Sequence, residues 1–216
     1  MINLMKQLLK TYLCTATLFT LMLSGCSSIP NDDFKLTIKQ SPQQRVASLQ
    51  HLSQWQVTGK IAFIETNNRN SASLNWQVDE NNNSQRLSLT SYLGINVLQL
   101  NSKGNNHTLK VDGKTYQGND LAALTYSLTG LILPTKALSF WLKGIAYQES
   151  DIISYDEITQ LPKTLSSHYN NELWQVSYSR YQQVANYSLA TKISIKKEGL
   201  LIKIAINEWS INTKNN

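Results

Sequence analysis

Histidines and paired carboxylates are the side chains here that could do acid–base or metal chemistry. The three histidines, His51, His107 and His168, lie far apart and share no ligand spacing, so no metal site is expected. Three acidic pairs sit in loop-like contexts, where solvated carboxylates are ordinary: Asp32-Asp33, Asp79-Glu80 and Asp156-Glu157. Because phosphate-loop, nucleophile-elbow and H-E-x-x-H motifs are also missing, the sequence predicts neither an enzyme nor a cofactor.

One cysteine offers a different chemistry, the attachment of lipid. Residues 1–25 carry two positive charges near their start, Lys6 and Lys10, and the apolar run 11–23 follows. That run is shorter than the roughly 20 residues that span a bilayer and is typical of a secretory signal peptide. It ends in Leu23-Ser24-Gly25-Cys26, which resembles the bacterial lipobox. The resemblance implies that Cys26 is lipidated, that residues 1–25 are removed, and that the new N-terminus is acylated.

The number and positions of the cysteines also agree with a lipid anchor. Cys14 would be lost with the leader, so Cys26 would be the only cysteine and no disulfide could form. Several acyl chains on one residue anchor a protein stably. Ser27 follows Cys26, whereas an aspartate there would resemble an inner-membrane retention signal. We therefore expect a protein anchored through Cys26 at the periplasmic face of the outer membrane.

The charge is mild for a chain of 216 residues, a length that suits one domain. The formal net charge is +6, and two of the lysines belong to the leader. The basic residues are mostly scattered, whereas a phosphate-binding surface needs them clustered. Nucleic acid is therefore not expected as a partner, while weak attraction to anionic lipid headgroups is compatible with the charge.

The segment 86–100 predicts a β-hairpin with an unusual tip. Leu87 and Leu89 alternate with polar residues, and a second apolar run follows Gly94. Hairpin tips are normally Asn, Asp, Gly or Ser, but this one is Tyr92-Leu93-Gly94. An exposed apolar tip would indicate contact with a membrane or another protein. The alternative is that Leu93 folds back onto the core.

The other helices and strands are predicted from the spacing of hydrophobic residues along the chain. Residues 26–42 form a tether, and residues 43–212 form the domain, which opens with a short helix capped by Ser41-Pro42. From residue 55 the period is two, apart from helices over 121–128 and 134–142. The pattern predicts a mainly β (α+β) fold, one antiparallel sheet of about 10–11 strands. So wide a sheet curls, which predicts a half-barrel with a hydrophobic cavity capped by the helices.

Large apolar residues on one face of these strands and helices are the candidate lining of that cavity. They are Trp55, Phe63, Leu74, Trp76, Trp141, Trp174 and Tyr178. Periodicity does not separate a cavity wall from a solid core, so Trp76 and Trp174 fit either position.

Several short motifs, in order and spacing, resemble the LolB family of outer-membrane lipoprotein receptors over residues 49–211. They are Gly59-Lys60-Ile61-Ala62, Leu74-Asn75-Trp76-Gln77, Leu93-Gly94, Leu133-Pro134 with Leu138-x-x-Trp141-Leu142-x-Gly144, Trp174-x-Val176-x-Tyr178-x-x-Tyr181 and Ile204-x-Ile206-x-x-Trp209.

The resemblance implies a half-barrel of about eleven strands that accepts acylated lipoproteins from the soluble carrier LolA and inserts them into the inner leaflet of the outer membrane. Its partners would be a LolA-like carrier, the acyl chains of cargo and outer-membrane lipids, and a monomer is expected. A protruding leucine needed for delivery matches Leu93, with Tyr92 where the family often has proline.

Two other functions fit the same residues. One is a periplasmic binding protein for another amphiphile, such as a phospholipid or glycolipid. The other is a structural envelope lipoprotein with a filled core.

Overall fold

The computed structural model describes residues 40–130 and 133–211, so the leader, Cys26 and most of the tether lie outside it. The helices are α2 (Pro42–Gln50), α3 (Leu121–Thr129) and α4 (Ala137–Lys143). The strands are β1 (Gln54–Glu65), β2 (Arg69–Asp79), β3 (Ser84–Thr90), β4 (Asn96–Lys103), β5 (Asn106–Val111), β6 (Lys114–Gly118), β7 (Ile152–Tyr155), β8 (Pro162–Tyr169), β9 (Glu172–Val184), β10 (Tyr187–Lys197) and β11 (Leu200–Ile211).

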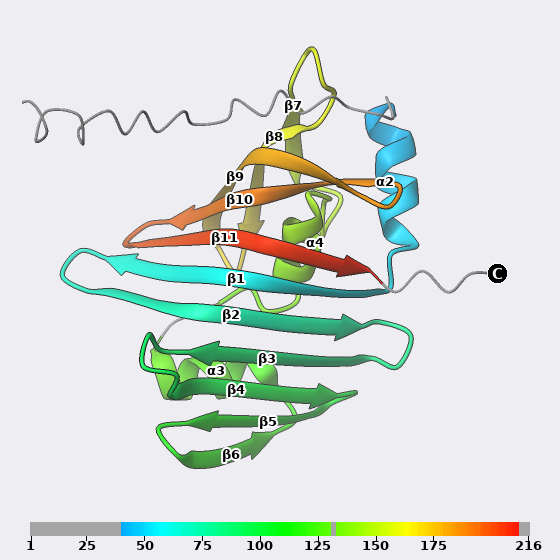
Figure 1. Ribbon diagram of the computed structural model, residues 1–216. Coiled ribbons are helices and arrows are strands. Elements are labelled where there is room, and N and C mark those ends of the chain that lie inside the picture. The colour runs from blue at the N-terminus through cyan, green and yellow to red at the C-terminus, as the bar shows by residue number, and fades with distance from the viewer. Residues whose placement is uncertain (1–39, 131–132, 212–216) are drawn as a thin grey trace, which may run out of the picture. The chain divides into compact units, whose positions relative to one another are not determined.

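All of these strands form one antiparallel sheet, in the order β6-β5-β4-β3-β2-β1-β11-β10-β9-β8-β7 (Figure 1). The first and last strands, β1 and β11, pair at its centre and join the two halves. The sheet does not close, because β6 and β7 are its two edges. The predicted class, a mainly β chain with an open antiparallel sheet of 10–11 strands and a few helices, is confirmed.

The first helix begins where the sequence predicts. The Ser41 hydroxyl accepts a hydrogen bond from the Gln44 backbone N–H at 3.3 Å, and the Gln44 side chain accepts one from the Ser41 N–H at 3.0 Å. This reciprocal pair is a capping box, and Pro42 occupies the first turn. The helix packs against β10 and buries Leu49.

Strand β9 breaks its alternation at Arg180, whose φ of +54° is left-handed. As a result Tyr178 and Tyr181 both hydrogen-bond on the covered face. The Tyr178 hydroxyl donates to the Trp141 carbonyl at 2.9 Å, and the Tyr181 hydroxyl donates to the Pro162 carbonyl at 2.6 Å. This kink explains the x-x spacing between the two tyrosines in the sequence motif.

Tryptophans organise the core under the central and C-terminal strands. The ring of Trp55 lies 5.3 Å from that of Trp76 and 5.6 Å from that of Trp209, and Trp141 of α4 lies 5.9 Å from Trp174 of β9. Each aromatic pair adds about 0.5–1.5 kcal/mol to the burial of its rings. Helix α4 is thereby fixed over β9 and β10.

The sequence assigned no strand to 152–155, where the structure has β7. This edge strand has only four residues, which is too few for a period of two to be recognised. The preceding loop is held by the Asp151 carboxylate, which accepts hydrogen bonds from the backbone N–H groups of Tyr147 and Gln148. Among the described residues no helix is long and apolar enough to cross a bilayer.

Candidate functional site

An apolar cavity of about 110 Å³ lies between the sheet and the helices α3 and α4. Strands β1 to β5 and β11 form its floor, and α3, α4 and the segment at 133–135 cover it. Apart from Gln85, Thr125 and Thr135, every lining side chain is aliphatic or aromatic. Such a lining binds hydrocarbon and offers few groups that could do chemistry.

Three of the predicted lining residues, Phe63, Leu74 and Trp76, do border this cavity. The other four do not and lie in the solid core: Trp55, Trp141, Trp174 and Tyr178. The reason is that α2 and α4 pack on β10, and Trp141 of α4 packs on Trp174 of β9, whereas the space over β2 to β5 is only partly filled by α3. Strand alternation assigned six of the seven to the correct face, and Trp141 was assigned to a helix, but alternation carries no information on which part of the sheet a helix covers.

The hairpin between β3 and β4 exposes its apolar tip. Tyr92 is 99 % exposed, Leu93 80 % and Ile95 63 %, and the side chain of Val97 is also at the surface. The alternative in which Leu93 folds back onto the core is therefore wrong. We call Tyr92, Leu93, Ile95 and Val97 the apolar tip. The sequence placed Ile95 and Val97 in a strand. The structure has Val97 in β4 but Ile95 before it, and both side chains are in solvent.

Hydrogen bonds hold this tip in one conformation without a proline. The Gly94 N–H donates to the Ser91 carbonyl at 3.0 Å, and the Ser91 N–H donates to the Ile95 carbonyl at 2.8 Å. The Ile95 N–H also reaches the Ser91 hydroxyl at 3.3 Å. Gly94 has a φ of +79°, a conformation that glycine adopts without strain.

A β-bulge explains why Val97 turns outward. Leu89 pairs with Leu98 but Thr90 pairs with Asn96, so Val97 is an extra residue in β4. The Asn96 side-chain carbonyl accepts hydrogen bonds from the Ser88 and Thr90 hydroxyls, at 3.3 and 3.2 Å. The bulge therefore frees one more apolar side chain for the tip.

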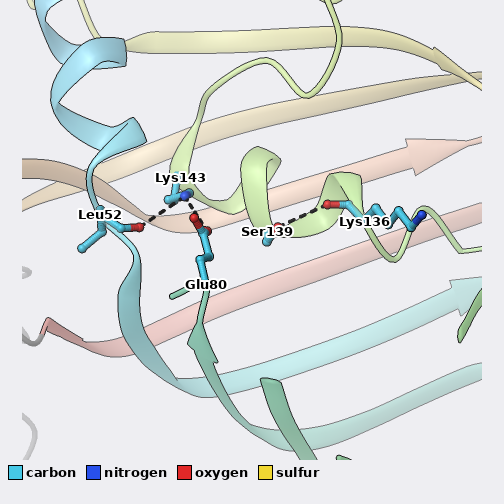
Figure 2. A network of polar contacts seen from close by, with 5 residues as sticks. All are labelled: Leu52, Glu80, Lys136, Ser139 and Lys143. Atoms are coloured by element: carbon cyan, nitrogen blue, oxygen red, sulfur yellow. Dashed lines mark hydrogen bonds and ion pairs between the residues drawn. The ribbon is translucent and has the colours of Figure 1, made fainter. Parts of the chain in front are cut away.

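Two buried cations fix the end of α4. The Arg45 guanidinium donates to the carbonyl oxygens of Gly144, Lys143 and Ser188 at 2.9, 2.7 and 3.2 Å. Burial lowers the pKa of Arg45 from its ordinary value. The Lys143 ammonium lies 2.9 Å from a Glu80 carboxylate oxygen and 3.4 Å from the Leu52 carbonyl (Figure 2). No sequence pattern indicates this network, because its members come from distant segments.

We expect Glu80→Gln to destabilise the fold, since it leaves the Lys143 ammonium buried without its counter-ion. Breaking a fully buried pair costs about 3–5 kcal/mol, and solvent at Glu80, 35 % exposed, reduces this to about 2 kcal/mol. The free energy of unfolding in urea measures the loss.

The matched control for Glu80→Gln is Glu172→Gln. Glu172 has the same exposure and lies 2.9 Å from Lys197, but the Lys197 side chain is 13 % exposed, against 1 % for Lys143. This variant should lose less than about 1 kcal/mol. Equal losses in the two variants would contradict a special role for the buried lysine.

The three histidines lie in three different elements. His51 ends α2, His107 lies in β5 and His168 lies in β8. Across 40–130 and 133–211, no three His, Cys, Asp or Glu side chains gather as metal ligands. The candidate site consists of the apolar cavity and the exposed apolar hairpin next to it.

Known proteins match this chain along most of its length. The family model for "Outer membrane lipoprotein LolB" matches residues 53–209. The LolB protein of Pseudoalteromonas translucida is 31 % identical, covering 96 % of this chain and 98 % of its own. The LolB protein of Aeromonas hydrophila is 34 % identical, covering 88 % of this chain and 92 % of its own. The LolB protein of Shewanella denitrificans is also 34 % identical, covering 96 % of each chain.

Solved structures show the same fold at low sequence identity. A LolA superfamily protein from Nitrosomonas europaea is 10 % identical, with a TM-score of 0.53 over 82 % of this chain and 96 % of that one. A DUF1329 family protein from Desulfovibrio piger is 8 % identical and has a TM-score of 0.52, over 80 % of this chain and 91 % of that one. The family model and the relatives together show that this chain belongs to the outer-membrane lipoprotein LolB family.

Proposed function

We propose that this protein accepts acylated lipoproteins from a LolA-type periplasmic carrier and passes them into the inner leaflet of the outer membrane. The acyl chains of the cargo occupy the apolar cavity, the apolar tip touches the leaflet, and no chemical step is involved. The observation that carries the proposal is the position of the cavity beside the tip. Leu87 and Leu89 line the cavity, and the same strand runs directly into the tip.

Direct transfer between apolar sites follows from the cost of exposing hydrocarbon. Each CH₂ brought into water costs about 0.8 kcal/mol, so a chain of about fifteen methylenes costs on the order of 12 kcal/mol. Such a chain does not cross the aqueous periplasm unprotected. It moves from the carrier to the cavity and then to the bilayer, and it needs no ATP if each receiver binds more tightly than the donor.

The cavity must widen to hold a whole chain. Its volume of about 110 Å³ is below the roughly 300–1,000 Å³ of typical ligand pockets. Helix α4 is the fixed part of the cover, because Ala137, Trp141 and Leu142 are fully buried. Helix α3 is the more easily displaced part, since it leaves Tyr126 in solvent and packs mainly against the edge strand β6 and its neighbour β5.

In this proposal Cys26 carries the lipid that anchors the protein, and residues 27–40 link the anchor to α2. The described residues contain their own hydrophobic core. We therefore expect a chain without the lipid to fold and to accept cargo in solution.

Transfer itself is the test. A labelled lipoprotein is loaded on LolA, the chain lacking residues 1–26 is added, and the label is followed by co-purification. We expect the label to move to this protein. Failure of the label to move would overturn the receptor function. Binding of free phospholipid with no acceptance from LolA would instead favour an amphiphile-binding protein, which the family match does not favour.

A further inference from the structure

A second, larger pocket opens beside the apolar cavity. Its volume is about 860 Å³, and it lies where the β2–β3 and β4–β5 turns face the beginnings of α3 and α4. Three residues, Gln85, Leu121 and Thr135, border both spaces. The pocket is therefore the vestibule of the cavity, and we use that name for it below.

The vestibule is polar where the cavity is apolar. His107 Nδ1 lies 2.9 Å from the Ser102 hydroxyl, and Lys136 contributes an exposed ammonium. Burial lowers the pKa of His107 from its ordinary value, which favours the neutral imidazole. The other charged side chains that line the vestibule, Asp79, Glu80 and Asp120, are acidic. Such a wall suits a neutral ligand with many carbonyl groups better than an anion.

Aromatic rings form the opposite side of the vestibule. Tyr147 lies between Phe140 and Tyr169, with ring centroids 5.3 and 6.2 Å away. Tyrosine at such a boundary offers an apolar ring and a hydroxyl to the same ligand. The wall can therefore contact both the alkyl and the polar parts of an amphiphile.

Gln85 marks the boundary between the two spaces. Its side-chain oxygen accepts a hydrogen bond from the Trp76 indole N–H at 3.1 Å. With the oxygen engaged by Trp76, the group that Gln85 offers a ligand is its amide N–H₂. A carbonyl oxygen at the top of a buried alkyl chain is a suitable acceptor for those donors.

We propose that the vestibule binds the polar head of the cargo, a diacylglyceryl cysteine with its ester carbonyls and the first peptide residues, while its acyl chains fill the cavity. This rests on the proposed function. It follows because each acyl chain is covalently joined to its carbonyl group, so a chain inside the cavity holds its ester at the cavity mouth.

The assignment also orients the cargo. The vestibule lies at the Ser84 end of β3 and the apolar tip follows its Thr90 end, about 20 Å away along the strand. Acyl chains whose esters sit in the vestibule then point their methyl ends toward the tip. Cargo would thus enter the leaflet tail first.

The test compares two probes on soluble protein lacking residues 1–26, a synthetic diacylglyceryl-cysteine peptide and an apolar fluorescent dye without a polar head. In Gln85→Leu the Kd for the lipopeptide should rise about tenfold, while the Kd for the dye should not rise, because leucine keeps the cavity lining apolar. Gln77→Leu is the matched control, because Gln77 is exposed on the neighbouring strand and does not line the vestibule. It should bind both probes like the parent.

A crosslink tests the place of the head without removing the Gln85–Trp76 hydrogen bond. A photoreactive phenylalanine analogue at Tyr147 should capture the peptide part of the bound lipopeptide. The same analogue at Tyr126, on the exposed side of α3, should not. Equal capture from both positions, or a Gln85→Leu variant that binds the lipopeptide normally, would overturn the vestibule assignment. If the parent binds neither probe, the proposed function itself fails.

Discussion

A Leu93→Glu variant should accept cargo from the carrier at the normal rate but fail to insert it into lipid vesicles. Leu93 is 80 % exposed, so the change removes no packing from the core. A leucine side chain gains about 2 kcal/mol on entering hydrocarbon, and a carboxylate resists entry, so the difference reaches about 3 kcal/mol. That corresponds to a roughly 100-fold loss of insertion. Transfer of a labelled lipoprotein from the loaded protein to vesicles measures it.

Ile158→Glu is the control for this experiment. Ile158 is 85 % exposed in the loop between β7 and β8, so the substitution introduces the same charge at an exposed apolar side chain on another loop. Its loop is held by the Asp156 carboxylate, which accepts hydrogen bonds from the Ile158 and Thr159 backbone N–H groups. We expect normal insertion from this variant. Normal insertion by Leu93→Glu, or equal loss from both variants, would show that the apolar tip does not enter the leaflet.

Local signals explain why much of this architecture could be read from the sequence. The Ser41 cap, the stop at Gly130 and the stop at Gly144 are each set by neighbouring residues, and all three occur as expected. The chemistry of the turn likewise located the apolar tip. What the sequence could not show was the exposure of Val97, because it depends on a bulge in the pairing of β3 with β4.

The cavity was harder to place because it depends on which part of the sheet the helices cover. Trp76 and Trp174 have the same alternating pattern, yet Trp76 borders the cavity and Trp174 packs against α4. The ion pair of Lys143 and Glu80 and the vestibule residue Gln85 carry no sequence signal either. They become recognisable only when distant segments are brought together.

Gly59 belongs to a sequence motif whose physical reason the structure supplies. It lies in β1 at a register shift against β11, between the Thr58–Glu208 and Gly59–Ile206 pairs. A Cβ on Gly59 would lie 2.2 Å from the Ala205 carbonyl oxygen and 2.9 Å from the Ile206 Cα. Both neighbours are backbone atoms, so the strands themselves would have to separate.

We therefore expect Gly59→Ala to cost about 3 kcal/mol or more, above the usual penalty for one added methyl group. Because β1 and β11 join the two halves of the sheet, the loss should appear in the global unfolding transition. For a domain of this size the melting temperature should fall by roughly 10 °C. Thermal unfolding followed by circular dichroism measures it.

Gly118→Ala is the matched control, since Gly118 also lies in a strand but a Cβ there would meet only the Leu124 side chain, at 3.9 Å. With room for the methyl group, alanine should leave stability unchanged or raise it slightly, because it restricts the unfolded chain. If Gly59→Ala melts like Gly118→Ala, the close approach of β1 and β11 does not require glycine. A large loss at Gly59 alone would show that the motif is there to keep the two central strands together.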